Sequence, residues 1–179
     1  MKLSTLSILL GMGAAAPQLY ALLKPKEFIE GARKFPRSLP WGYALMAAGV
    51  LGFFYFLRSE SLSDFEKYKP VMFAAFGGVA VAVCIFVSDF LAVRGLAIAM
   101  MVLGKLMVDT ARWHDSSWRL VIVIWAYVFV CLGIWFTVSP WRCRDLLHWF
   151  TASEQRLKNF SLVRLAFAVF VVVLGLTVF

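Results

Sequence analysis

The residues of this chain whose types and spacing could do chemistry are charged residues within or beside one apolar segment, 90–109. In chain order they are Asp89, Arg94, Lys105, Asp109 and Arg112. Arg94 and Lys105 are eleven residues apart, which at about 100° per residue places them about 20° apart around a helix. Asp109 and Arg112 continue the same stripe at helical spacing. Because the stripe carries more positive than negative charge, it predicts an anion or headgroup site.

A second interpretation of the same stripe involves no binding. A charge at the centre of a bilayer costs at least about 2.5–3.5 kcal/mol, so such residues usually face a protein interior or a water-filled cavity. Arg94 and Lys105, however, each lie about one turn from an end of the predicted helix, so both could extend to the membrane surface. Lys105 and Asp109 would then form an ordinary ion pair between positions i and i+4. The sequence leaves both interpretations open.

The elements that must position these residues are apolar helices. Of the 179 residues 62% are hydrophobic and 16% charged, and the mean hydropathy is +0.82, which excludes an ordinary soluble domain. Since a spanning helix takes about 20 residues, we expect a single domain over 1–179, an all-α bundle of six transmembrane helices with two interfacial amphipathic helices. The predicted spans are 3–23, 41–57, 71–88, 90–109, 119–138 and 162–179.

Residues 71–109 could form one long helix or two helices joined by a tight turn at Ser88-Asp89. With the turn, alternate loops place eleven Lys and Arg residues on one side of the membrane and seven on the other; with one long helix the tally is eight against nine, with Arg94 unassigned. Because positive charge is retained on the cytoplasmic side, the count favours the turn. It then predicts that both termini lie outside the cytoplasm and that Asp89 is the N-cap of the fourth span.

The first apolar segment has two interpretations. Met1-Lys2 followed by apolar residues and Ala14-Ala15-Ala16 is typical of a cleaved secretory signal. Pro17 directly after the candidate site would hinder cleavage, and apolar character continues to Leu23. This favours an uncleaved first helix over 3–23 with a proline inside it.

Two basic loops, 25–35 and 140–157, each have apolar residues at helical spacing with charges between them. Each predicts a short amphipathic helix in the membrane interface, and in the six-span topology both loops face the cytoplasm. We expect their basic residues to contact anionic lipid headgroups or a protein partner. These residues are Lys24, Lys26, Arg33, Lys34, Arg37, Arg142, Arg144, Arg156 and Lys158.

Several chemistries lack the residues they need. The sequence has no zinc-hydrolase, nucleophile-elbow or phosphate-loop motif, and no histidine lies in a predicted span to ligate haem. Cys84, Cys131 and Cys143 have no metal-ligand spacing. We therefore expect no catalytic residue, metal or cofactor, and no nucleic-acid partner despite the net charge of +8.

The leading functional hypothesis is a non-enzymatic polytopic protein, an accessory or scaffold subunit of a membrane complex, in a bacterial cytoplasmic membrane. One alternative is a small transporter for an anion or proton-coupled solute, lined by the polar stripe; another is a lipid-modifying enzyme using Asp89 and Arg94. We expect self-association or a membrane-protein partner. Helix contacts are expected at small residues such as Gly77-Gly78, Gly95 and Gly104, because apolar burial gives no drive between helices already in lipid.

Overall fold

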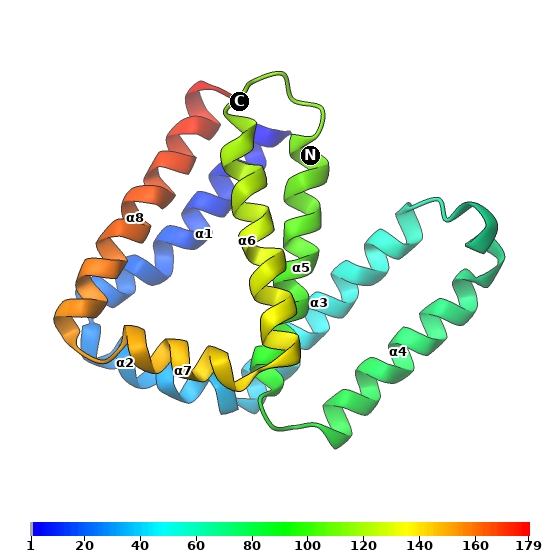
Figure 1. The fold of residues 1–179 in the computed structure, drawn as a ribbon, viewed down its shortest axis with the longest axis horizontal. Helices are drawn as coiled ribbons and strands as arrows, with labels where there is room; N and C mark the ends of the chain where they lie inside the picture. Colours follow the sequence, from blue (N-terminus) through cyan, green and yellow to red (C-terminus); the bar gives the residue numbers. More distant parts are fainter. Residues whose placement is uncertain (1) are drawn as a thin grey trace. The chain divides into compact units, whose positions relative to one another are not determined.

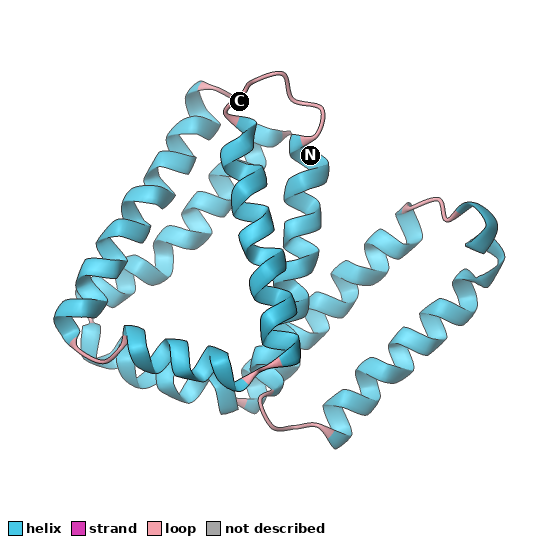
Figure 2. Cartoon of the chain, in the orientation of Figure 1, coloured by secondary structure: helices cyan, strands magenta, loops and turns pink. Residues whose placement is uncertain are grey.

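The computed structural model describes residues 2–179, which form helices and no strand (Figures 1 and 2). The long helices are α1 (Leu3–Leu23), α3 (Leu39–Ser59), α4 (Lys69–Phe86), α5 (Leu91–Ala111), α6 (Arg119–Val138) and α8 (Glu154–Thr177). The short ones are α2 (Pro25–Lys34), α7 (Trp141–Phe150) and the 3-10 turns η1 (Phe35–Arg37) and η2 (Ser63–Tyr68). Six segments are long and apolar enough to cross a membrane, η2 and α4 together counting as one. The predicted all-helical fold with six such segments is confirmed.

The joint at Ser88-Asp89 separates two helices, as charge counting predicts. α4 ends at Phe86, α5 begins at Leu91, and Phe90 between them has a φ of 56°. A left-handed phenylalanine cannot continue a right-handed helix, so the chain turns there. The Phe90 carbonyl accepts the first helical bond, from the Arg94 N–H at 3.1 Å. The expectation that Asp89 is the N-cap is therefore wrong by one position, since Phe90 precedes α5 directly.

The second amphipathic helix is shorter than predicted. α7 ends at Phe150, whereas the sequence predicts an interfacial helix over 140–157. The Ser153 side chain accepts a hydrogen bond from the Arg156 N–H at 3.2 Å, which starts α8 at Glu154. Because an N-cap serine favours a new helix, the last turns assigned to the loop belong to α8. Pro40 and Pro70 lie in the first turns of α3 and α4, where the missing N–H of proline costs little.

The chain divides into two compact units. Unit 1 comprises residues through Lys34, Leu103–Val130 and Arg144–Phe179; unit 2 comprises Phe35–Val102 and Cys131–Cys143. In unit 1, α1 and α8 run antiparallel, because a Cβ at Gly11 would meet Val172 and one at Gly175 would meet Ser4 and Ile8. The start of α1 and the end of α8 thus lie at one end of unit 1, and α2 and α7 lie at the other.

A buried apolar cluster lies at the end of unit 1 that carries the start of α1 and the end of α8, which we call the terminal end. It consists of Leu3, Leu6, Met107, Ala111, Ile122, Ala126 and Val171, contributed by α1, α5, α6 and α8. The predicted small-residue contact at Gly104 is found here, where a Cβ would lie 2.9 Å from Val130 and 3.1 Å from the Ala126 carbonyl oxygen. The four helices therefore pack closely at this end.

Unit 2 is built from α3, α4 and α5 in alternating directions. α3 and α5 are parallel, since a Cβ at Gly42 would meet Leu91 and one at Gly49 would meet Ile98. The predicted small-residue contact at Gly95 is also found. A Cβ there would lie 2.6 Å from the Met46 backbone nitrogen, the shortest such distance at a glycine of unit 2. α4 runs antiparallel to α3 through aromatic contacts. These join Phe53 to Phe76 and Phe54 to Phe73, with ring centroids 5.0 and 5.1 Å apart.

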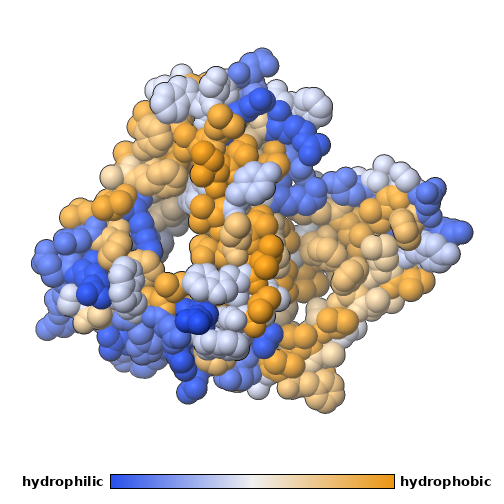
Figure 3. Space-filling view, in the orientation of Figure 1, coloured by the Kyte–Doolittle hydropathy of each residue, from blue (hydrophilic) through white to orange (hydrophobic). Residues whose placement is uncertain are grey.

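α4 is the least enclosed of the long helices. None of its residues is buried, and a Cβ at Gly78 would meet no atom within 4 Å. Within the described residues the Gly77-Gly78 pair therefore makes no close helix contact, unlike Gly95 and Gly104. Figure 3 shows the hydrophobic surface along α4 and α6, with hydrophilic residues gathered at helix ends and loops.

The α1–α8 contact can be tested with two glycines of one helix. In Gly11→Ala the new methyl would lie 2.5 Å from Val172 Cγ2 and 2.8 Å from the Ala168 carbonyl oxygen. We expect it to destabilise the protein by about 1–3 kcal/mol, the usual cost of overpacking. Gly13→Ala is the matched control, since nothing lies within 4 Å of its Cβ, and it should be neutral or stabilising by up to about 1 kcal/mol. Thermal unfolding in detergent measures both; equal melting temperatures would contradict this packing.

Candidate functional site

Two amphipathic helices, α2 and α7, lie at the same end of unit 1. In α2, Phe28, Ile29 and Ala32 are half-buried and the charged residues are exposed. In α7, Leu146, Leu147 and Phe150 are half-buried, whereas His148 and Trp149 are exposed. Both helices thus direct their apolar stripe inward and their polar face outward, as the sequence predicts.

One arginine ties α2 to the turn between α7 and α8. Arg33 Nη2 donates to the Thr151 carbonyl oxygen at 2.8 Å, and Arg33 Nε donates to Thr151 Oγ1 at 3.2 Å. Thr151 is 2% exposed, and its hydroxyl donates to the Leu147 carbonyl oxygen at 2.7 Å. The planar guanidinium makes two bonds to one residue, so residues 118 positions apart are held in a fixed geometry.

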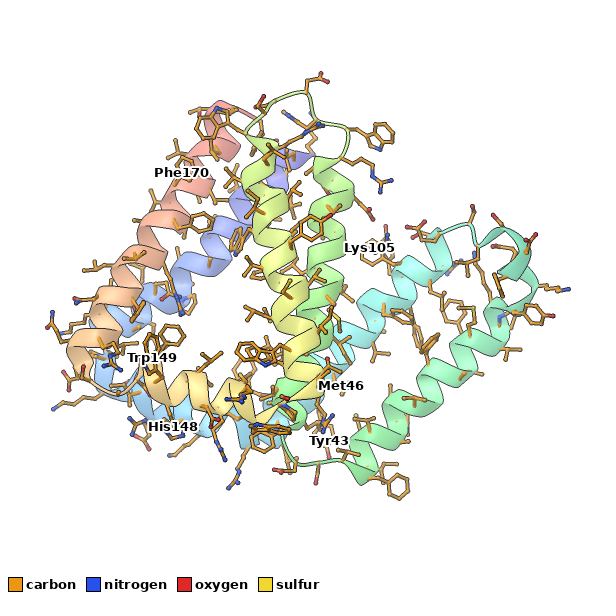
Figure 4. The ribbon with its side chains drawn as sticks, viewed as in Figure 1. Tyr43, Met46, Lys105, His148, Trp149 and Phe170 are labelled. Carbon is orange, nitrogen blue, oxygen red and sulfur yellow. The ribbon has the colours of Figure 1, made fainter. Side chains whose placement is uncertain are left out.

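Arginines and aromatic rings gather around this turn. The rings of Trp149, Phe150 and Phe160 have centroids 5.0–5.4 Å apart. The Arg156 guanidinium lies 5.2 Å from the Trp149 ring centre, and that of Arg164 lies 4.3 Å from Phe150, within the range of a cation–π contact. Figure 4 shows Trp149 on α7, beside the start of α8.

We call this cluster the basic–aromatic joint. It comprises Arg33, Trp149, Phe150, Thr151, Arg156, Phe160 and Arg164. Sequence reasoning includes Arg33 and Arg156 among the contact residues but misses their partners. A threonine and three aromatic residues flanking the break at Ser153 are the signal that could have indicated them.

Carboxylates partly neutralise the predicted basic surface. Lys24 pairs with Glu27 at 2.9 Å, Lys34 pairs with Glu30, and Arg144 pairs with Asp145 at 2.9 Å. Hydrogen bonds from Lys24 and Tyr20 lower the pKa of Glu27, and a hydrogen bond from Lys34 lowers the pKa of Glu30. Spacings of three and four residues in the sequence signal the pairs of Lys24 and Lys34, whereas Arg144 and Asp145 are adjacent.

The remaining predicted contact residues differ in exposure. Lys26 and Arg142 are exposed, and Lys158 is half-buried. Arg37 belongs to unit 2, where its guanidinium lies 5.9 Å from the centre of the Phe90 ring. Arg142 also belongs to unit 2. Lys26 and Lys158 are therefore the cations of unit 1 best placed to meet an external anion beside the joint.

The residues of the polar stripe of α5 are divided between the two units. Lys105 Nζ and Asp109 Oδ2 are 2.8 Å apart, with side chains 38% and 36% exposed, so the predicted i,i+4 pair is confirmed (Figure 4 labels Lys105). Arg112 is exposed in the same unit. Asp89 and Arg94 belong to unit 2, Asp89 being exposed in the turn before α5.

Arg94 lines a cavity of about 320 Å³ within unit 2, a volume typical of small ligand sites. The other lining residues are Met46, Val50, Phe53, Phe54, Phe76, Val79, Ala80, Val83, Ile98, Met101 and Thr137. The Arg94 Nε is buried and has no hydrogen-bond partner among the described residues. A guanidinium thus stands at the wall of a cavity whose other lining residues, apart from Thr137, are apolar.

Other groups that could do chemistry are dispersed. Among residues 2–179 no three His, Cys, Asp or Glu side chains are grouped to hold a metal ion. His114 contacts Phe179 at the terminal end of unit 1, with ring centroids 5.1 Å apart, whereas His148 is in α7 at the opposite end. The three cysteines are free thiols, and burial raises the pKa of Cys143 to about 11, which makes it a poor nucleophile.

The fold and these clusters define an all-helical protein with six segments able to cross a membrane. No family model, curated protein or solved structure matches the chain.

Arg33 provides a test of the joint. In Arg33→Gln the bonds from a charged donor to Thr151 are lost, and we expect a cost of about 1–2 kcal/mol, the lower part of the range for charged hydrogen bonds because Arg33 is partly exposed. Amide hydrogen exchange over Pro25–Lys34 should accelerate. Lys26→Gln, on the same helix with an exposed side chain, is the control and should leave exchange unchanged. Equal protection in both variants would show that Arg33 does not hold α2.

Proposed function

We propose that the chain is an integral membrane protein whose six long segments span a bilayer. Their length and hydropathy support this, as do the many large apolar side chains on their outer faces, such as Leu51, Ile85 and Ile124, each at least 60% exposed. An exposed apolar surface of this extent needs lipid around it. The end of unit 1 that carries α2 and α7 is then the cytoplasmic end, by the distribution of positive charge. Both termini lie outside the cytoplasm, and a bacterial inner membrane fits this topology.

Within that membrane we propose a non-enzymatic role as an accessory or scaffold subunit. The observation that carries it is the bonding of α2 to the α7–α8 turn by Arg33. Two amphipathic helices held at one end make a fixed platform of apolar stripes and outward charges. Such a platform suits docking of anionic lipid or of a partner subunit.

The joint retains donors for an anion. Arg33 uses Nε and Nη2 on Thr151, and Arg156 uses Nη1 on the Trp149 carbonyl oxygen at 3.2 Å, which leaves part of each guanidinium fork unused. Lys26, Arg142 and Lys158 add positive charge at α2, α7 and the start of α8. Aromatic rings beside cations are typical of a membrane interface. Anionic headgroups are thus the ligand class that this surface favours.

The lipid preference can be measured on protein extracted with its surrounding lipid in polymer nanodiscs. In the triple variant Lys26→Gln/Arg142→Gln/Lys158→Gln, enrichment of phosphatidylglycerol over phosphatidylcholine should fall roughly tenfold, since each cation near an anionic surface contributes about 1 kcal/mol before screening by salt. The control of equal charge is Arg58→Gln/Lys67→Gln/Arg112→Gln, whose residues lie on the opposite face in the proposed topology. If the enrichment of phosphatidylglycerol falls equally in both variants, it depends on net charge alone, and the platform of α2 and α7 is refuted as the lipid-binding surface.

The accessory role has its own experiment. The tagged protein is purified from its native membrane in mild detergent, and the mass and composition of the complex are determined. A stoichiometric membrane-protein partner, lost in the triple variant, is the expected result. A homo-oligomer without any partner would contradict the accessory role.

A second candidate is a small transporter for an anion or a proton-coupled solute, which the half-exposed Lys105–Asp109 pair favours. In proteoliposomes enclosing a pH-sensitive dye, proton-coupled uptake should disappear in Lys105→Leu while insertion and melting temperature stay unchanged. Lys2→Leu, the same substitution at an exposed lysine outside the stripe, is the control and should keep uptake. Loss of folding in Lys105→Leu, or uptake equal to the original chain, would leave the ion pair with a packing role alone.

A further inference from the structure

The cavity of unit 2 is elongated and has a polar end and an apolar end. The contacts at Gly95 place Arg94 at the level of Leu45 and Met46 on α3 (Figure 4 labels Met46). The lining residues run from Arg94 to Met101 on α5 and from Met46 to Phe54 on α3. At a rise of 1.5 Å per residue, these runs cover about 10–12 Å.

The aromatic residues close the end of the cavity away from Arg94. A Cβ at Gly52 would meet Val102, so Phe53 and Phe54 lie near the Met101 level, and Phe76 contacts Phe53 there. On α4, which runs the other way, Val83 lies toward the Arg94 end and Phe76 toward the aromatic end. The cavity is thus a slot with one guanidinium at one end and hydrocarbon side chains along the rest of its length.

Arg94 is placed where a lipid headgroup would meet it. It is the fourth residue of α5, about one turn from the helix start and hence near the bilayer surface if α5 spans the membrane. Arg37 adds a second cation beside Phe90 just before α5. The Arg94 Nε is enclosed by protein atoms and has no hydrogen-bond partner among the described residues, so the donors that a headgroup would meet are the two Nη groups of the same guanidinium.

We propose that this slot binds one anionic phospholipid, whose phosphate accepts hydrogen bonds from Arg94 and one of whose acyl chains lies between α3, α4 and α5. The amphiphile matches the slot in both respects, charge at the Arg94 end and hydrocarbon along the Phe-lined end. The arginine fork suits phosphate oxygens, which satisfy the guanidinium donors. No lining residue of the slot belongs to α2 or α7, and the proposal extends the function to specific lipid retention by unit 2.

The first experiment labels the site in the unaltered protein. Phosphatidylglycerol carrying a photoreactive diazirine on one acyl chain is added to the protein in nanodiscs, irradiated, and its adducts are located by peptide mass spectrometry. Adducts at slot residues such as Val50, Ala80 and Ile98, displaced by excess phosphatidylglycerol but not phosphatidylcholine, are expected. Adducts spread over the outer faces of α1, α6 and α8 as heavily as in the slot would overturn the proposal.

Two variants then separate the headgroup from the chain. Arg94→Gln should lower phosphatidylglycerol labelling in the slot about tenfold, the usual order of effect when a charged hydrogen-bond partner is removed, and leave phosphatidylcholine labelling unchanged. Ala80→Leu, which fills the slot, should lower labelling by both lipids. Arg58→Gln, in the same unit with an exposed side chain, is the control. Labelling in Arg94→Gln equal to the control would refute the phosphate contact, whether or not the platform of α2 and α7 binds lipid, since none of its residues is changed.

Discussion

Two apolar helices gain little by exchanging lipid for each other, so close approach of their backbones must hold this chain together. The contacts at Gly11 and Gly175 in unit 1, and at Gly42 and Gly95 in unit 2, bring helix backbones near enough that a methyl group would collide with a neighbouring chain atom or side chain. Dispersion between closely fitted surfaces then replaces the hydrophobic drive of a soluble core. The close contacts at these glycines set the helix registers. The positions of the basic–aromatic joint and of Arg94 depend on those registers.

Those registers explain why the charged residues do different things. Antiparallel pairing of α1 and α8 brings the end of α1 and the start of α8 together, so α2 lies beside the α7–α8 turn and Arg33 reaches Thr151. Parallel pairing of α3 and α5 places Arg94 beside Met46 and not at a free helix surface. One arginine thus finds backbone and hydroxyl acceptors within the protein, whereas the other is left with a buried Nε.

The features that the sequence predicts are those that depend on hydropathy and on the distribution of charge along the chain. Hydropathy locates all six apolar segments, and the charge tally separates α4 from α5 at a joint with no glycine or proline. Local geometry escapes it, because neither the positive φ of Phe90 nor the Ser153 cap that divides α7 from α8 follows from periodicity. The cavity escapes it altogether, since its lining combines residues from α3, α4, α5 and α6 that share no local pattern. Gly77-Gly78 resembles Gly95 in sequence, but only the register shows which of them is used.

The exposure of α4 and the cavity have a common physical cause. α4 packs against α3 through the rings of Phe73 and Phe76, and bulky rings hold two helices further apart than glycines do. A helix held at that distance leaves space on the side facing α5, and this space is the slot that ends at Arg94. Lipid chains fill such space readily, because they adapt to its shape without the loss of any hydrogen bond. A lipid retained there by its charge would act as a packing element for α4, which makes the same arginine a determinant of both ligand and fold.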